Sequence, residues 1–244
     1  RGSSSLLLGT ISRLAAFWSG EQICGQNGVE SSPSGKTQLS QSSTVELYKG
    51  DLPPGRFTAK AIAVDTETLG LNPHRDRLCL VQLSDGDGTA ALVQIAPGAD
   101  APELKRLLAD AGVLKIFHYA RFDVAVLKHY LGVDTAPIYC TKIASKLART
   151  YTDRHGLKDL CRELLGIELS KQQQSSDWGA DMLSPDQLNY AASDVLYLHA
   201  LKERLDAMLE REGRQHFAHA CFAFLPVRAE LDLKGWPETD IFAH

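Results

Sequence analysis

The sequence lacks a strong positive charge, paired cysteines and long apolar runs. Its net charge is −4, and this disfavours a protein that coats long nucleic acid, since such surfaces are basic. The five cysteines are odd in number and form no C-x-x-C pair, which argues against a zinc ribbon or a disulfide framework and indicates a reducing compartment. No run of about 18 uncharged apolar residues occurs, so no membrane span is expected.

Residues 1–43 differ in composition from the rest of the chain. They are rich in Ser and Gly, and the first methionine of the sequence is Met182. The first twenty residues contain Arg1 and Arg13 but no acid, which resembles an organelle transit peptide; a tag or translated upstream sequence is the favoured alternative. We expect a flexible non-domain segment over 1–43 and one domain over 44–244. A cytoplasmic location is expected, or an organelle matrix if 1–43 is a transit segment.

The region after Val45 alternates short apolar runs with turn residues. An apolar content of 44% is enough for a sizeable core. The order of three strands, a helix, a strand and then mainly helices predicts an α/β domain with a mixed central β-sheet flanked by helices. The expected strands are 59–64, 78–83, 90–95 and 114–117, the expected helices are 102–110 and 122–130, and the chain beyond Tyr139 is expected to be mainly helical.

Two acidic residues, Asp65 and Glu67, follow the first expected strand. Residues two apart in a strand point to the same face, so the two carboxylates are presented together. Keeping two like charges side by side is unfavourable unless a cation neutralises them. The pattern alone is weak, because about one such pair is expected by chance in a chain of this composition, and a solvated strand end explains it equally well.

Two further acidic positions could complete a site. Asp123 lies in an early turn of the helix expected after the strand 114–117, where a carboxylate also interacts favourably with the helix dipole. Tyr190 and Asp194 are four residues apart in a helix expected to start after Pro185, so they share one helical face. A surface helix pair is the alternative for these two residues.

Taken together, Asp65, Glu67, Asp123, Tyr190 and Asp194 resemble the signature of the DEDD exonucleases of the tyrosine subtype, in the RNase D superfamily. The chain is most similar to the small NrnC-type (nanoRNase C) exoribonucleases. Tyr119 departs from the Asn common in RNase D, which puts a strict tRNA-processing role in doubt. The likeness extends over most of residues 45–244 through the segments 63–71, 78–83, 117–123, 156–160, 176–178 and 235–244.

The resemblance implies an RNase H-like exonuclease fold and a two-metal phosphodiesterase. It implies that Asp65 bridges two divalent cations, that Glu67 and Asp194 hold the ion nearer the attacking water, and that Asp123 holds the other, partly through water. Hard oxygen ligands suit Mg²⁺ or Mn²⁺, and the absence of a Cys or His cluster argues against zinc. Tyr190 is expected to orient the water rather than act as a base, since a free Tyr has a pKa near 10.

The resemblance also implies a substrate, an assembly and a set of substrate contacts. Very short RNA, dinucleotides above all, is the expected substrate, and a closed homo-oligomeric ring, an octamer, is the expected assembly. Leu71 is expected to wedge between the two terminal bases, with core packing as the alternative. The residues expected to contact substrate are Thr66, Thr68, Leu69, Leu71, His118 and Tyr119.

Three alternatives remain at this point. The chain could be a general RNase D-like exonuclease that acts on longer RNA or single-stranded DNA. It could be an inactive nucleotide-binding scaffold, although the intact set of five residues argues against this. The C-terminal tail, with Trp236, Ile241 and Phe242, could form an oligomer interface or pack on its own domain.

Overall fold

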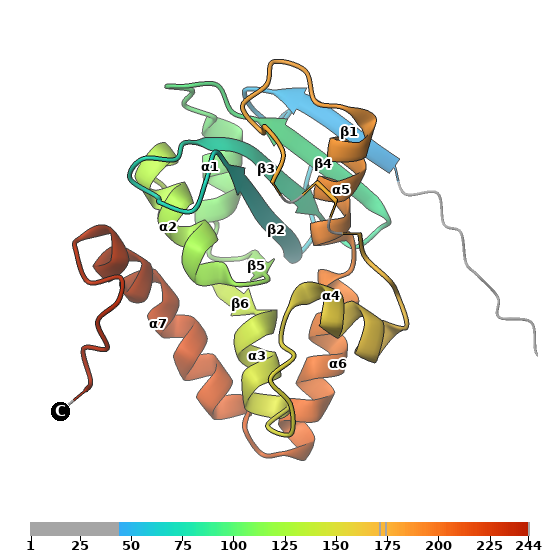
Figure 1. The fold of residues 1–244 in the computed structure, drawn as a ribbon, viewed down its shortest axis with the longest axis vertical. Helices are drawn as coiled ribbons and strands as arrows, with labels where there is room; N and C mark the ends of the chain where they lie inside the picture. Colours follow the sequence, from blue (N-terminus) through green and yellow to red (C-terminus); the bar gives the residue numbers. More distant parts are fainter. Residues whose placement is uncertain (1–43, 171, 174, 244) are drawn as a thin grey trace, which may run out of the picture. The chain divides into compact units, whose positions relative to one another are not determined.

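The domain is built on a six-stranded mixed sheet with the strand order β1-β4-β3-β2-β5-β6 (Figure 1). The computed structural model describes residues 44–170, 172–173 and 175–243, so the expectations for 1–43 lie outside the described residues. β2 and β3 pair antiparallel, as do β3 and β4, while the outer pairs are parallel. The α/β prediction is confirmed. The strands are β1 Thr44–Lys49, β2 Ala61–Thr68, β3 Leu78–Ser84, β4 Thr89–Gln94, β5 Leu114–Phe117 and β6 Ile138–Cys140.

The strand that carries the first acidic pair is longer than the apolar run suggests. The apolar run was expected over 59–64 with the two acids at the strand's end, whereas β2 runs from Ala61 to Thr68 and both acids lie inside it. The cause is pairing with β3, where Asp65 lies opposite Gln82 and Glu67 opposite Leu80. The hydrogen-bonded neighbour extends the strand beyond its apolar part, and the ladder becomes irregular only between Glu67 and Thr68.

Two strands were not predicted. β1 lies at one edge of the sheet, parallel to β4, and its side chains are mostly exposed or half-buried, so it has no apolar run to mark it. β6 has only three residues and lies at the other edge beside β5. Both omissions have the same physical reason, because an edge strand is defined by its pairing partner more than by its own apolar pattern.

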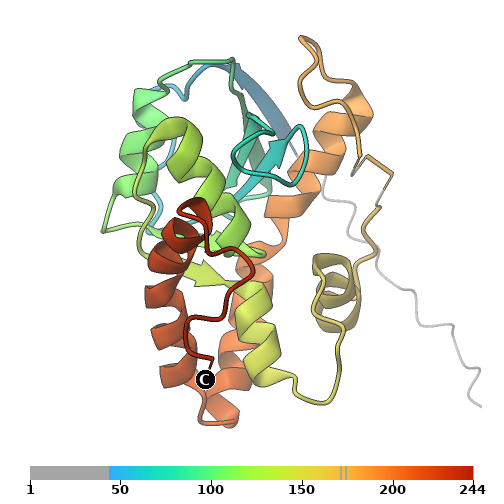
Figure 2. The same cartoon turned by 60° about the vertical axis from the view of Figure 1, so that its left-hand side comes forward.

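Helices cover both faces of the sheet. α5 packs across β2, β3 and β4 on one side, while α1 and α2 lie on the other (Figures 1 and 2). α5 begins as predicted at Pro185, with a capping box between Ser184 and Gln187. α2 ends at Leu131, and Gly132, which was predicted to stop the helix, caps it. The remaining bounds are α1 Pro102–Ala109, α2 Ala120–Leu131, α3 Thr141–Ala148, α4 Leu157–Leu160, the π-helix η1 Cys161–Leu165, α5 Pro185–Leu196, α6 Leu198–Arg211 and α7 Gln215–Leu233.

Four of the five cysteines lie in the described residues. Cys79, Cys140 and Cys161 are buried free thiols, and Cys221 is an exposed one. In the part of the chain that the structure describes, we find no helix with both the length and the apolar character that crossing a bilayer requires.

A fully buried lysine on β5 ties two loops together. The Lys115 ammonium donates hydrogen bonds to the carbonyl oxygens of Asp110 and Val113, both at 2.7 Å, and to that of Ala136. Burial lowers the pKa of Lys115 to about 8, so the ammonium is still protonated at neutral pH. A buried cation is tolerated here because every proton has an acceptor.

Replacing this lysine should destabilise the domain. Lys115→Met leaves three carbonyls without their donor, and we expect a loss of about 2 kcal/mol in the free energy of unfolding. Urea denaturation monitored by circular dichroism measures it. Lys128→Met, on the surface of α2, is the control and should change stability by less than about 0.5 kcal/mol. Equal effects of the two variants would contradict the role of the buried ammonium.

Candidate active site

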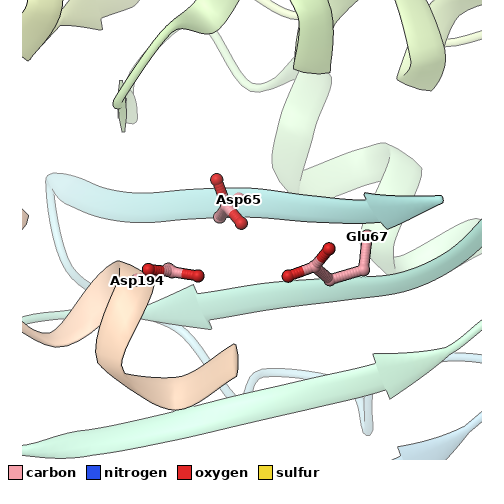
Figure 3. A group of neighbouring side chains, drawn as sticks. All are labelled: Asp65, Glu67 and Asp194. Atoms are coloured by element: carbon pink, nitrogen blue, oxygen red, sulfur yellow. The ribbon is translucent and has the colours of Figure 1, made fainter. Parts of the chain in front are cut away.

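Three carboxylates converge beside the centre of the sheet. Asp65 and Glu67 project from the same face of β2, and Asp194 reaches towards them from α5 (Figure 3). One carboxylate oxygen from each of the three lies within 4.8 Å of the others. The strand supplies two acids at i and i+2, and the packing of α5 across β2 supplies the third. Residues far apart in the sequence therefore form one oxygen-lined site.

The fourth acid occupies a different position. Asp123 is buried in the first turns of α2 and accepts a hydrogen bond from the Thr66 hydroxyl at 2.7 Å. Thr66 lies between Asp65 and Glu67 and therefore points to the opposite face of β2. Asp123 is outside the cluster of three, although its charge still acts on it. The structure thus brings three of the predicted acids together and holds the fourth through Thr66.

The electrostatics of the acids show how unfavourable the arrangement is without a cation. Burial raises the pKa of Asp65 well above its usual range, and the carboxylates of Asp123, Asp194 and Glu67 raise it further. Burial is also the main cause of the raised pKa values of Glu67, Asp123 and Asp194. Each carboxylate therefore resists ionisation next to the others. A divalent cation would reverse this balance, because it stabilises the ionised forms.

Tyr190 stands one helical turn before Asp194 on α5, as predicted. Its ring is tilted against the indole of buried Trp178, with 6.0 Å between the ring centres. Burial raises the pKa of the Tyr190 phenol, and the charges of Asp194, Glu67 and Asp65 raise it further. The packing against Trp178 fixes the direction in which the phenol points.

The three clustered acids, Asp65, Glu67 and Asp194, border a cavity of about 650 Å³ together with Tyr190. All six residues predicted to contact substrate line the same cavity: Thr66, Thr68, Leu69, Leu71, His118 and Tyr119. The alternative of core packing for Leu71 is wrong, because 85% of its surface is exposed. Asp123 is the one predicted site residue that does not line the cavity.

His118 and Tyr119 occupy the turn between β5 and α2. Tyr119 adopts the left-handed conformation, with φ 72°, which is uncommon for a residue other than glycine and often accompanies function. The His118 Nδ1 lies 2.8 Å from the Thr141 hydroxyl, which itself donates to the Phe117 carbonyl. The hydroxyl therefore accepts from Nδ1–H, and Nε2 keeps its lone pair. Burial, with a smaller contribution from Lys142, lowers the pKa of His118 to about 3.

Several residues of the cavity were not predicted as site residues. Lys142 places its ammonium 4.1 Å from the centre of the Tyr119 ring, a cation–π contact. It follows β6, the strand that was missed, so no pattern in the sequence indicated its position. Lys158, Ser176 and Trp178 also line the cavity, and the resemblance had marked only their segments; Ser175 lines it too and lay in no marked segment.

The donor set fits divalent cations of the hard type. Asp65, Glu67 and Asp194 offer only carboxylate oxygens within mutual reach, and Asp123 adds a fourth carboxylate close behind. Among the described residues no nitrogen or sulfur ligand joins the group, which suits Mg²⁺ or Mn²⁺ better than zinc. The raised pKa values are what four such groups show when no cation compensates them. The fold and the site together define the class, an RNase H-like nuclease with a carboxylate metal centre.

Comparison with known proteins identifies the family within this class. The family described as 3′–5′ exonuclease matches residues 55–210, more than half of the chain. The chain therefore belongs to the 3′–5′ exonucleases, in the DEDDy group of the RNase D superfamily, and is NrnC-like. The predicted family is confirmed.

Individual relatives show how far the likeness extends. A structure of Brucella melitensis NrnC bound to pGG is 60% identical, with a TM-score of 0.81 over 83% of this chain and 100% of that one. A structure of the same protein with bound Mg²⁺ is 60% identical, with a TM-score of 0.79 over 82% and 99% of the two chains. Ribonuclease D of Gluconacetobacter diazotrophicus is 35% identical over 67% of this chain and 42% of its own. The chain thus spans about two fifths of the length of the curated relatives it matches.

Proposed function

We propose that this exonuclease hydrolyses very short RNA, dinucleotides above all, from the 3′ end to nucleoside 5′-monophosphates. The observation that carries the proposal is the cluster of Asp65, Glu67 and Asp194 on the wall of the cavity. The bound pGG of the 60% identical NrnC supports a short substrate. The net charge of −4 supports it too, because long RNA would need an extended basic surface.

The carboxylates would hold two divalent cations, Mg²⁺ or Mn²⁺. When bound, such cations stabilise the charge on the attacking and leaving oxygens of an in-line phosphoryl displacement. Asp65 belongs to the cluster of three and also experiences the charge of Asp123, so it would contribute to both cation positions. Glu67 and Asp194 would serve one position, and Asp123 the other. The Mg²⁺ bound to the related NrnC supports this assignment of cofactor.

The protein side chains would orient the reacting groups. Tyr190, fixed by Trp178, would hold the attacking water through its hydroxyl. Leu71, at the mouth of the cavity, would insert between the two bases of the substrate through its apolar side chain. Tyr119 would stack on a base or contact ribose, and His118 would present its Nε2 as an acceptor to a ribose hydroxyl. The wall of the cavity would be completed by Thr66, Thr68 and Leu69.

The size of the cavity also favours a short substrate. A volume of about 650 Å³ is in the range that holds a single small ligand and not an extended strand. Among the described residues of its wall, Lys142 and Lys158 are the cationic side chains, and they could contact the phosphates of a bound short RNA. The alternative, a general RNase D-like exonuclease, would need further phosphate contacts beyond this cavity.

We also propose that the chain assembles into a homo-oligomer, with an octameric ring as the expected form. Large apolar side chains are exposed on α7 and on the tail that follows it: Phe217, Val227, Trp236, Ile241 and Phe242. The tail turns back along α7 (Figure 2) and Phe242 contacts Phe224, with 5.8 Å between the ring centres. The tail thus packs on its own domain and still leaves an apolar surface. Analytical ultracentrifugation measures the assembly directly.

Cleavage of 5′-labelled RNAs of two, three and seven residues tests the proposed substrate. With Mg²⁺ or Mn²⁺ present, we expect the dimer to disappear rapidly while the seven-residue RNA is little changed. Stepwise shortening of the seven-residue RNA at a comparable rate would favour the general exonuclease. No cleavage of any length, with correctly folded protein, would reject the enzymatic function and favour a nucleotide-binding scaffold.

Divalent cations should stabilise the folded protein measurably. At a concentration about 100 times the dissociation constant, binding to the folded state adds about 2.7 kcal/mol, which raises the melting temperature by several degrees. Protons compete for the same carboxylates, whose pKa values are raised, so the stabilisation should increase as the pH rises. Thermal melts with Mn²⁺ and then with excess EDTA measure it. An equal melting shift in Asp194→Asn would place the cations elsewhere.

A further inference from the structure

The loop that carries Leu71 is held by internal contacts although its tip is exposed. This loop, residues 69–77, joins β2 to β3 and is here called the Leu71 loop. Leu71 is 85% exposed and has no packing of its own to fix it. An apolar side chain presented to water must be held by its backbone if it is to be in place before substrate arrives. The hydrogen bonds of the loop show which residues do this.

The carboxylate of Asp76 is the centre of the Leu71 loop. It is 7% exposed, and its Oδ2 accepts the backbone N–H of Asn72 at 2.9 Å. The backbone N–H of Asp76 in turn donates to the Asn72 carbonyl at 2.8 Å. The Arg75 guanidinium adds two bonds, at 2.6 and 2.8 Å, from a largely exposed side chain. The two bonds between Asn72 and Asp76 close the loop on the C-terminal side of Leu71, while the exposed Arg75 pair contributes little.

Gly70, on the N-terminal side of Leu71, lies directly against the Asp76 carboxylate. Its φ angle is not in the left-handed region, so backbone freedom is not the reason for a glycine here. A Cβ placed on Gly70 would lie 2.4 Å from Asp76 Oδ2 and 2.8 Å from Asp76 Cγ. The carboxylate thus occupies the space that any other side chain would need. The Asp76 carboxylate can therefore keep this position only while residue 70 is glycine.

The base of the loop is attached to the body of the domain. The Leu69 N–H donates to the Arg77 carbonyl at 3.2 Å, and the Arg77 guanidinium donates to the Ile95 carbonyl at 3.1 Å. Leu69 also contacts Gly179 closely enough that a Cβ there would lie 2.9 Å from Leu69 Cδ2. The base of the loop is therefore fixed as well. The backbone position of Leu71 then depends on the contacts of Asp76 with Gly70 and Asn72.

We propose that Asp76 and Gly70 are positioning residues that hold Leu71 at the mouth of the cavity and so determine the affinity for short substrate. The inference rests on the proposed role of Leu71 in substrate binding. A side chain that is already in its bound position loses less conformational entropy when the substrate binds. Loss of Asp76 should therefore weaken substrate binding without changing the chemical step, because the hydrogen bonds of its carboxylate go to Asn72 and Arg75 and not to the carboxylate cluster.

A double-mutant cycle on Leu71 and Asp76 tests the inference. We expect Leu71→Ala and Asp76→Ala each to raise KM for a 5′-phosphorylated RNA dinucleotide about tenfold, with kcat within about twofold of the parent. The double variant should raise KM no further than the larger single effect, because Asp76 acts through Leu71. Asp76→Asn keeps an acceptor for the Asn72 N–H and should recover part of the affinity.

Controls separate this role from general stability. Arg75→Ala removes the exposed ion pair but leaves the bond from Asn72 to Asp76, and it should leave KM unchanged. Gly70→Ala forces the carboxylate out of place and should raise KM as Asp76→Ala does, which keeps the test valid if Asp76→Ala does not fold. Melting temperatures in parallel show whether any loss reflects unfolding.

The failures of the two proposals can be told apart. If Leu71→Ala raises KM but Asp76→Ala and Gly70→Ala do not, or if the effects on KM multiply in the double variant, the positioning role is wrong and the role of Leu71 stands. If Leu71→Ala leaves KM unchanged, the proposed contact of Leu71 with the bases is wrong, and the positioning role of Asp76 and Gly70 is rejected as well. If no variant, including the parent, cleaves the dinucleotide, the proposed substrate itself is wrong.

Discussion

Asp65→Asn should abolish hydrolysis while leaving the protein folded. Asp65 clusters with Glu67 and Asp194, and the charge of Asp123 raises the pKa of Asp65 more than any other carboxylate does, so we propose that both cation positions share Asp65. Losing one charged ligand weakens the stabilisation of transition-state charge by several kcal/mol, and we expect kcat to fall at least about 10³-fold. The rate of dinucleotide cleavage at saturating Mn²⁺ measures the loss.

The same substitution should not lower stability in the absence of cations. Burial and three neighbouring carboxylates raise the pKa of Asp65, which means that its ionised form destabilises the folded state. A neutral amide of the same shape removes this repulsion, so the melting temperature in EDTA should stay the same or rise. Asp134→Asn is the control, since that side chain is 83% exposed and should affect neither quantity. A melting temperature that falls together with kcat would contradict the catalytic explanation.

The sequence was informative where physical constraints are local. The strands 78–83, 90–95 and 114–117 were predicted within about one residue, because buried strands must be continuous apolar runs. The helix carrying Tyr190 and Asp194 was predicted from Pro185 onward, since proline is favoured in a first helical turn. The grouping of the distant acids, by contrast, came from the family resemblance and not from spacing.

The sequence was uninformative where long-range contacts decide the structure. Nothing in the pattern around Lys142 shows that it lies over the Tyr119 ring, because that contact depends on β6 pairing with β5. The separation of Asp123 from the other three acids depends on its bond with Thr66, which spans 57 residues. The Leu71 loop is similar, since the need for Gly70 appears only when the Asp76 carboxylate is seen beside it.

A second network, remote from the carboxylates, supports the opposite wall of the cavity. Arg149 at the end of α3 has a fully buried guanidinium, which donates to the Arg154 carbonyl at 2.8 Å and to Glu163 on η1. Glu163 is only partly buried, with 30% of its side chain exposed. α4, which immediately precedes η1, contributes Leu157, Lys158 and Asp159 to the cavity. The ion pair thus fixes the short helical segment that lines the site.

The two halves of this ion pair should not be equally costly to remove. Glu163→Ala leaves a buried guanidinium without its counter-charge, and we expect the free energy of unfolding to fall by about 3 kcal/mol, the lower end for such pairs because Glu163 is partly hydrated. Arg149→Met removes the buried charge itself, and its loss should be smaller, because the exposed face of Glu163 remains in water. The double variant should therefore be more stable than Glu163→Ala alone, which urea denaturation of the three proteins can show.

The matched control is Glu212→Ala. Glu212 has nearly the same exposure, 32%, but its partners, Arg211 at 67% and the more distant Arg214 at 32%, are both exposed enough to stay hydrated when the carboxylate is lost. Its removal should cost less than about 1 kcal/mol. If Glu163→Ala and Glu212→Ala destabilise the protein equally, or if Arg149→Met is the more damaging change, burial of the guanidinium does not control the stability of this wall. A parallel fall in dinucleotide affinity for Glu163→Ala would show that the position of α4 affects substrate binding.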